Sequence, residues 1–297
     1  MALKGQAQIF GINYLWTNTA GGDFNVAANW SPNGVPGVND GAIIANIGNF
    51  TVHLNTSAAI AGLTLGGSTL MYGRQTLSIT NPAAIFTVGG DMLIDRSGVL
   101  SFSGSAISCP SNSTVNGIFN VMSGSIGSTN AASGLVTVTT NGAWSLIGVA
   151  TLYEPVANYG TVVLTNGGSL NLGRSSTFPV AFTNELNALV DIQNDQAISF
   201  ASGVPNPPST AGIYNYGLLR KSVGATNSAT SIRVPFHNNG TIQPLAGDLV
   251  FSGGLSLSSS SDLQFLMAAA KPGMMTLASP APATNSPPTL PTLGSPS

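Results

Sequence analysis

Apolar and polar residues alternate in short runs along most of the chain, and the clearest run extends from Val156 to Gly173. Within it, residues 161–164 and 169–172 each alternate with a period of two, and Asn166-Gly167-Gly168 separates them. This pattern predicts two strands with one buried face each, joined by a turn. The residues expected to point inward are Val162, Leu164, Leu170 and Leu172.

The same unit recurs along the chain with a glycine at the corresponding place. These repeat glycines are Gly117, Gly142, Gly160, Gly217 and Gly240, at intervals of 25, 18, 57 and 23 residues. The longest interval holds one weaker copy at Phe182-Thr183-Asn184. A unit of this length cannot bury its apolar face alone and must stack on its neighbours. The repeat therefore predicts a β-solenoid.

No segment between the expected strands has the 3.6-residue periodicity of a crossover helix, which disfavours a parallel sheet built from βαβ units. The predicted fold class is all-β, a right-handed parallel β-helix with an N-terminal aromatic cap, and a β-sandwich is the second choice. Three regions are predicted: a cap region at 1–48, β-solenoid repeats at 49–278, and a Pro/Ser/Thr-rich linker tail at 279–297.

Trp16 and Trp30 frame a segment rich in Gly, Asn and Pro that differs from everything after it. A first coil must cover the open end of a solenoid core, and large aromatic side chains with tight turns can do so. The alternative is that both indoles are exposed and form a glycan contact, since aromatic faces suit sugar rings. We favour the cap, because aromatic side chains are usually buried.

Charged residues make up only 6% of the chain and the net charge is −2. Without a basic stripe, nucleic acid is not an expected partner. No run of eighteen apolar residues predicts a membrane-spanning helix. Cys109 is the single cysteine, so no internal disulfide is expected, and the residues after Lys4 form no clear signal peptide.

Candidate chemistry is sparse. The densest group of carboxylates is Glu185, Asp191 and Asp195. An acid–base pair or a calcium site needs such a group. However, aspartates are common in turns, and two carboxylates alone do not provide enough ligands for a metal ion. His53 and His237 have no second His or Cys at ligand spacing. We therefore predict no catalytic residue, no metal ligand and no cofactor.

Asparagine recurs near the repeat glycines. Stacked coils place equivalent residues about 4.8 Å apart, so their amides can form a ladder that satisfies polar groups without charge repulsion. The predicted structural ladder consists of Asn116, Asn141, Asn158, Asn215 and Asn239.

Several motifs resemble a known family. They are Trp16, Gly21-Gly22-Asp23-Phe24, Ala28-Asn29-Trp30-Ser31, Val35-Pro36, the run from Asn39 to Ile44, and the later stretches 215–222, 236–241 and 247–254. Together they resemble bacterial surface proteins with autotransporter-associated β-strand, adhesin-like repeats. The resemblance implies an extracellular or cell-surface location, and that family has no shared catalytic set to transfer.

The predicted function is a non-catalytic extracellular structural or adhesion module, with glycans or other copies of the chain as partners. One alternative is a polysaccharide-binding or polysaccharide-degrading β-helix enzyme, which the fold suits but which lacks grouped acids. A second alternative is a self-assembling extracellular filament subunit, because another copy can extend an open solenoid edge.

Overall fold

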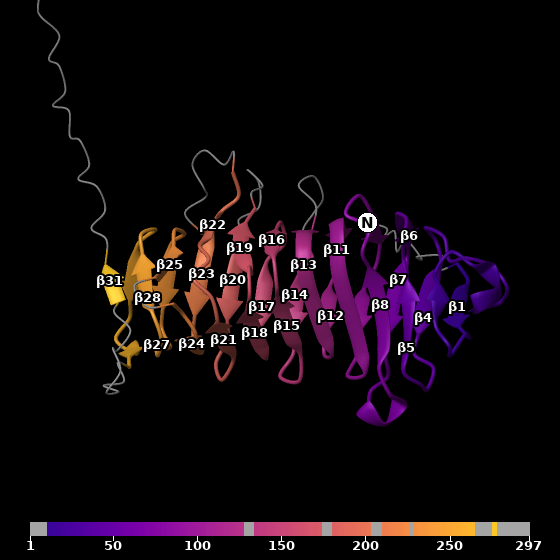
Figure 1. Ribbon diagram of the computed structural model, residues 1–297, viewed down its shortest axis with the longest axis horizontal. Coiled ribbons are helices and arrows are strands. Elements are labelled where there is room, and N and C mark those ends of the chain that lie inside the picture. Colours follow the sequence, from indigo (N-terminus) through magenta and orange to yellow (C-terminus); the bar gives the residue numbers. More distant parts are fainter. Residues whose placement is uncertain are drawn as a thin grey trace, which may run out of the picture.

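The computed structural model describes residues 11–127, 134–173, 180–202, 210–225, 228–264 and 275–277. They form an elongated stack of coils that runs along the long axis from the indigo N-terminal end to the yellow C-terminal end (Figure 1). Strands of one coil pair in parallel with the equivalent strands of the next. The predicted all-β parallel β-helix is therefore confirmed and a sandwich of antiparallel sheets is excluded, while the right-handed sense stays a prediction.

One sheet, called sheet A, follows the whole length of the stack. Its strands, in spatial order, are β29 (Leu255–Leu257), β26 (Phe236–Asn238), β23 (Gly212–Asn215), β20 (Ala181–Asn184), β17 (Val156–Asn158), β14 (Val136–Val138), β12 (Ser113–Val115), β10 (Met92–Ile94), β7 (Gly62–Leu65), β4 (Gly41–Ile44), β1 (Asn13–Trp16) and β3 (Trp30–Ser31).

The remaining strands form two further ladders, which the long strands β11 (Gly98–Ser108) and β13 (Ile118–Ile126) join because each runs through both. The first also contains β2 (Gly22–Asp23), β5 (Phe50–His53), β8 (Gln75–Ile79), β15 (Ala143–Leu146), β18 (Thr161–Leu164), β21 (Leu189–Ile192), β24 (Leu218–Lys221), β27 (Thr241–Pro244) and β30 (Asp262–Leu263). The second contains β6 (Ala58–Ile60), β9 (Ile85–Val88), β16 (Val149–Leu152), β19 (Ser169–Leu172), β22 (Ile198–Phe200), β25 (Ala229–Ile232), β28 (Asp248–Phe251) and β31 (Met275–Leu277). Two short 3-10 helices, η1 (Ala27–Asn29) and η2 (Leu70–Tyr72), lie in connections.

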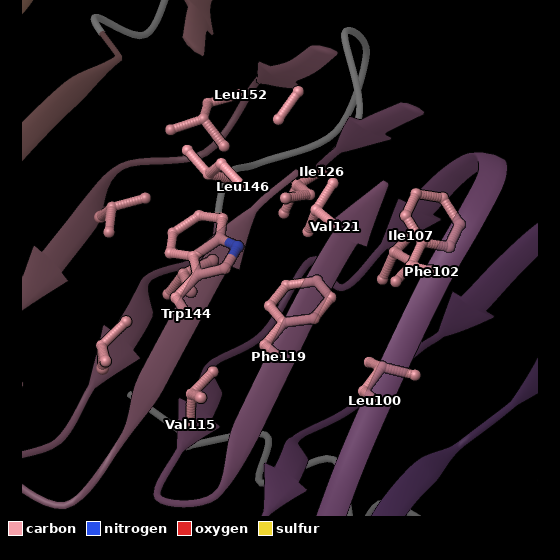
Figure 2. Close-up of a cluster of buried hydrophobic side chains, with 14 of the residues drawn as sticks. Leu100, Phe102, Ile107, Val115, Phe119, Val121, Ile126, Trp144, Leu146 and Leu152 are labelled. Atoms are coloured by element: carbon pink, nitrogen blue, oxygen red, sulfur yellow. The ribbon is translucent and has the colours of Figure 1, made fainter. Parts of the chain in front are cut away.

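Alternate side chains of the strands fill the interior of the stack. The four residues predicted to point inward in β18 and β19 are all buried, which confirms the assignment of their faces. Equivalent residues of adjacent coils pack on one another, as Figure 2 shows for Phe119 and Trp144. Their rings stack with centroids 5.5 Å apart and an interplanar angle of 12°. Stacked coils thus supply the burial that no single repeat can achieve.

The N-terminal end is closed by aromatic side chains, as the sequence predicts. Strand β3 pairs antiparallel with β1 at the edge of sheet A, and the ring of Trp30 lies edge-on to those of Trp16 and Phe24, with centroids 5.0 and 4.9 Å away. The parallel ladder already includes β1 and β4, so it begins upstream of the boundary predicted at residue 48. The predicted linker tail at 279–297 lies outside the described residues.

The repeat glycines lie where one coil passes very close to the preceding coil. A Cβ at Gly160 would overlap the carbonyl oxygens of Thr139 and Gly142, and a Cβ at Gly240 would overlap that of Gly217. Neither glycine has a positive φ, so close approach and not backbone angle explains the residue type. The recurrence seen in the sequence therefore marks a corner of the coil with no room for a side chain.

We expect Gly160→Ala to lower the free energy of unfolding by about 1–3 kcal/mol, because the added methyl group must displace backbone atoms. Gly167→Ala is the matched control, since its Cβ would lie 3.7 Å from the nearest atom, the carbonyl oxygen of Ile147. That variant should stay within about 0.5 kcal/mol of the parent. Urea denaturation measures both, and equal midpoints for the two variants would contradict the close-approach explanation.

Candidate functional site

The two tryptophans proposed as a glycan contact are buried. Trp16 is 0% exposed and Trp30 is 3% exposed. Their indole N–H groups donate to the backbone carbonyls of Asn18 and Phe24, both at 2.7 Å. A sugar platform needs an exposed ring face. The alternative of a glycan contact at Trp16 and Trp30 is therefore wrong, and the favoured assignment of both residues to the cap agrees with their burial.

An amide ladder exists, but its members differ from the predicted set. It consists of Asn158, Asn184, Asn215 and Asn238, at the inward-pointing ends of β17, β20, β23 and β26. The Nδ2 group of each of the first three donates to Oδ1 of the next, at 2.8, 2.7 and 2.7 Å. These bonds span coils of 26, 31 and 23 residues.

The remaining predicted members lie outside this column. Asn116 and Asn239 each follow the last inward residue of a strand by one position, so they do not share its face. Asn116 instead donates to Oδ1 of Asp95 and accepts from Oγ1 of Thr139, both at 2.8 Å. Asn141 is exposed in a turn. The ladder predicted for Asn116, Asn141 and Asn239 is therefore wrong.

The amide ladder replaces aliphatic residues in one inward column of sheet A. Val138 occupies the corresponding place before Asn158, and Leu257 occupies it after Asn238. The amides also bond to backbone atoms at the corner: Nδ2 of Asn158 donates to the carbonyl of Leu189 at 3.1 Å, and Oδ1 accepts from the Gly160 N–H at 3.1 Å. The ladder thus pairs polar atoms that would otherwise be buried without partners.

The carboxylate of Asp191 forms an ion pair with the next coil. Arg220, its register partner in β24, donates from Nη2 to Oδ2 at 2.9 Å and from Nε to Oδ1 at 3.2 Å. Gln193 donates to Oδ2 at 2.9 Å. Burial raises the pKa of the Asp191 carboxyl, but hydrogen bonds from Arg220, Ser222 and Gln193 outweigh it, and the pKa is lowered overall.

A buried lysine holds the second carboxylate of the predicted group. Lys221 is 0% exposed, and its Nζ donates to Oδ1 of Asp195 at 2.8 Å, Oγ1 of Thr230 at 3.0 Å, and the carbonyls of Asn194 at 2.6 Å and Val223 at 3.2 Å. Burial raises the pKa of the Asp195 carboxyl, but the hydrogen bond from Lys221 and other interactions lower it, so that the pKa is lowered overall. Lys221 thus ties one coil to the next from inside the fold.

The candidate metal residues do not converge in the described part of the chain, which contains no group of three His, Cys, Asp or Glu side chains able to hold an ion. Glu185 is half-buried at the start of a turn, whereas Asp191 and Asp195 bond to Arg220 and Lys221 of the next coil. His53 is exposed at the end of β5, as its alternation predicts.

A surface hollow of about 290 Å³ lies at the C-terminal end of sheet A. It is lined by Tyr214, Tyr216, His237, Asn238, Asn239, Ser256, Leu257 and Ser258. Tyr214, His237 and Ser256 are register partners in β23, β26 and β29. The rings of Tyr214 and His237 stack with centroids 4.7 Å apart and an interplanar angle of 15°. The hollow thus combines aromatic surface with hydroxyl and amide groups.

One feature of the sequence, apart from the repeat glycines and asparagines, indicates this hollow. Tyr214 and Tyr216 flank Asn215, and His237 and Asn239 flank Asn238. Because side chains alternate along a strand, an inward Asn places its neighbours on the outer surface. What the sequence does not show is that the next coil places Ser256, Leu257 and Ser258 beside these rings.

Comparisons with known proteins give no match: no protein-family model, no curated protein and no solved structure matches the chain. Among the described residues, no helix has the length and apolar character needed to cross a membrane. Any function must therefore be argued from the geometry of the solenoid itself.

Proposed function

We propose that this chain is a non-catalytic, extracellular β-solenoid module with a structural or adhesive role at a bacterial cell surface. The observation that carries the proposal is the pairing of the grouped carboxylates: Asp191 with Arg220 and Asp195 with Lys221. Both bonds join adjacent coils, so these acids stabilise the stack. The resemblance to adhesin-like surface repeats supports the proposed location.

Polysaccharide hydrolysis usually needs two carboxyls on either side of the sugar, one of them with a raised pKa so that it can donate a proton. Asp191 and Asp195 have lowered pKa values and accept hydrogen bonds from cations. Burial raises the pKa of Glu154 to about 7, but that side chain is enclosed in the fold, where a substrate does not reach it. These carboxyls are thus suited to structure and not to acid–base chemistry.

We expect no new reducing ends when the protein is incubated with a panel of acidic and neutral polysaccharides. Asp191→Asn and Glu185→Gln are assayed beside the parent, because Asp191 is ion-paired whereas Glu185 forms no ion pair within the described part of the chain. Product release that disappears in Asp191→Asn would contradict the proposal and move the chain to the enzyme class. Release that is equal in all three proteins and that is lost when the protein is purified further would come from a contaminant, whereas release that persists would contradict the proposal.

A further inference from the structure

The hollow at the end of sheet A exists because the outward side chains at two equivalent positions of successive coils become smaller toward the C-terminus. One column runs from Tyr214 through His237 to Ser256. The positions two residues further along each coil are Tyr216, Asn239 and Ser258, which also line the hollow. Large rings are thus followed by short hydroxyl side chains, which leave the space beside the rings open.

The half-buried imidazole of His237 lines this open space. Tyr214 stacks against it on one side, and Ser256, its register partner on the other side, is too short to cover a ring. Tyr214 is itself held in place, since its hydroxyl donates to the Thr210 carbonyl at 3.1 Å. An aromatic face in a concave site favours a ligand with an apolar face of its own.

The polar atoms around this ring are neutral. The lining supplies the Asn239 amide and the hydroxyls of Tyr216, Ser256 and Ser258, and the described residues that line it include no Asp, Glu, Lys or Arg. The Nε2 atom of His237 is shielded from solvent, so a ligand in the hollow can form hydrogen bonds with the amide and hydroxyl groups of the lining and not with this atom.

From this arrangement we infer that the hollow binds one residue of a neutral pyranose sugar. A pyranose has an apolar C–H face that suits the ring of His237 and a rim of hydroxyls that suits the Asn and Ser groups. The volume of about 290 Å³ lies near the lower limit of small-molecule sites, roughly 300–1,000 Å³, and so suits a single sugar ring. This inference rests on the proposed adhesive role and names its ligand class.

The chain has only two histidines, so NMR can follow the imidazole signals of His237 and His53 directly. The full chain is titrated with glucose, galactose, mannose and N-acetylglucosamine, and with indole as an aromatic ligand that is not a sugar. At least one sugar should shift the His237 signals saturably and leave the His53 signals unmoved, because His53 is in another coil. Signals of His237 that no sugar moves, or that only indole moves, would overturn the inference.

Variants of residues that line the hollow test whether the sugar that shifts the His237 signals binds there. Tyr216→Ala should weaken sugar binding about tenfold, as expected for the loss of an aromatic contact. Tyr159→Ala is the matched control. Tyr159 follows Asn158 of the amide ladder as Tyr216 follows Asn215, and the two side chains are 44% and 41% exposed. Tyr159 does not line the hollow. Equal loss in both variants would contradict the site.

A third variant tests the site without removing a packed ring. Ser256 is exposed, so Ser256→Tyr should leave the fold intact, cover the His237 ring and abolish the sugar-dependent shift. Unchanged binding in a folded Ser256→Tyr protein would overturn the inference. The outcomes are separable: polysaccharide cleavage contradicts the non-catalytic role, whereas failure of sugars to bind at His237 contradicts only the sugar site.

Discussion

We expect Leu172→Asp to lower the free energy of unfolding by about 4 kcal/mol or more, because the variant places an unpaired carboxylate inside the stack. Leu172 is completely buried at the end of β19, between Leu152 of one coil and Phe200 of another. Typical domains have only about 5–15 kcal/mol of stability, so the variant should be close to unfolding or unfolded at room temperature. Circular dichroism during urea titration measures the effect.

The matched control is the preceding residue in the same strand. Asn171 faces outward, and its Oδ1 accepts a hydrogen bond from Oγ of Ser199 at 2.8 Å, a role that Asp can retain. Asn171→Asp should therefore change the stability by less than about 1 kcal/mol. If Leu172→Asp were as stable as Asn171→Asp, the assignment of inward and outward faces in this coil would be wrong.

The second large effect concerns Glu154, which lies between β16 and β17 and is 2% exposed. Its Oε2 atom has no hydrogen-bond partner among the described residues. Burial raises the pKa of this carboxyl from 4.5 to about 7, and a hydrogen bond from the Cys109 backbone opposes the shift only in part. Glu154 is therefore protonated in the folded protein under mildly acidic conditions.

The direction of the pH effect follows from this shift. Below pH 4.5 both states hold the proton and Glu154 contributes no pH dependence. Between pH 4.5 and about 7 the unfolded chain releases the proton while the folded chain keeps it, so stability falls as the pH rises. Above about pH 7 the loss is complete, and at 1.36 kcal/mol per pKa unit it amounts to about 3 kcal/mol.

Glu154→Gln removes this titration and leaves every other ionisable group in place. We expect the free energy of unfolding of the parent to fall by about 3 kcal/mol more than that of the variant between pH 4.5 and pH 8. Urea denaturation of both proteins at several pH values provides the two curves. Parallel curves would show that the folded protein does not raise the pKa of Glu154.

Part of this fold can be predicted from patterns along the sequence. Alternation assigned Leu164 and Leu172 to the interior, and recurrence identified Gly160 and Gly240 as special positions. Trp16 and Trp30 were recognised as cap residues for a general reason, the tendency of large aromatics to be buried. These conclusions depend on alternation within a strand, on the composition of one segment or on recurrence along the chain, and none of them requires the register between coils.

The errors share a different origin, because they concern which residues of successive coils lie side by side. Coils of 26, 31 and 23 residues carry loops of different lengths, so spacing along the chain does not give the register between coils. The predicted amide ladder therefore included Asn239 where the structure uses Asn238, and it omitted Asn184.

The sequence by itself determined the strand periodicity, the stacking of repeats and the positions that must be small or apolar, because side-chain alternation and steric limits act over a few residues. Only the tertiary structure decided that Asp191 meets Arg220, that Lys221 is buried on Asp195, and that His237 lies beside Ser256. These contacts join different coils, and the packing of the whole stack sets how the coils align. Each coil must form strand hydrogen bonds with its neighbour and pack its core side chains against those of its neighbour.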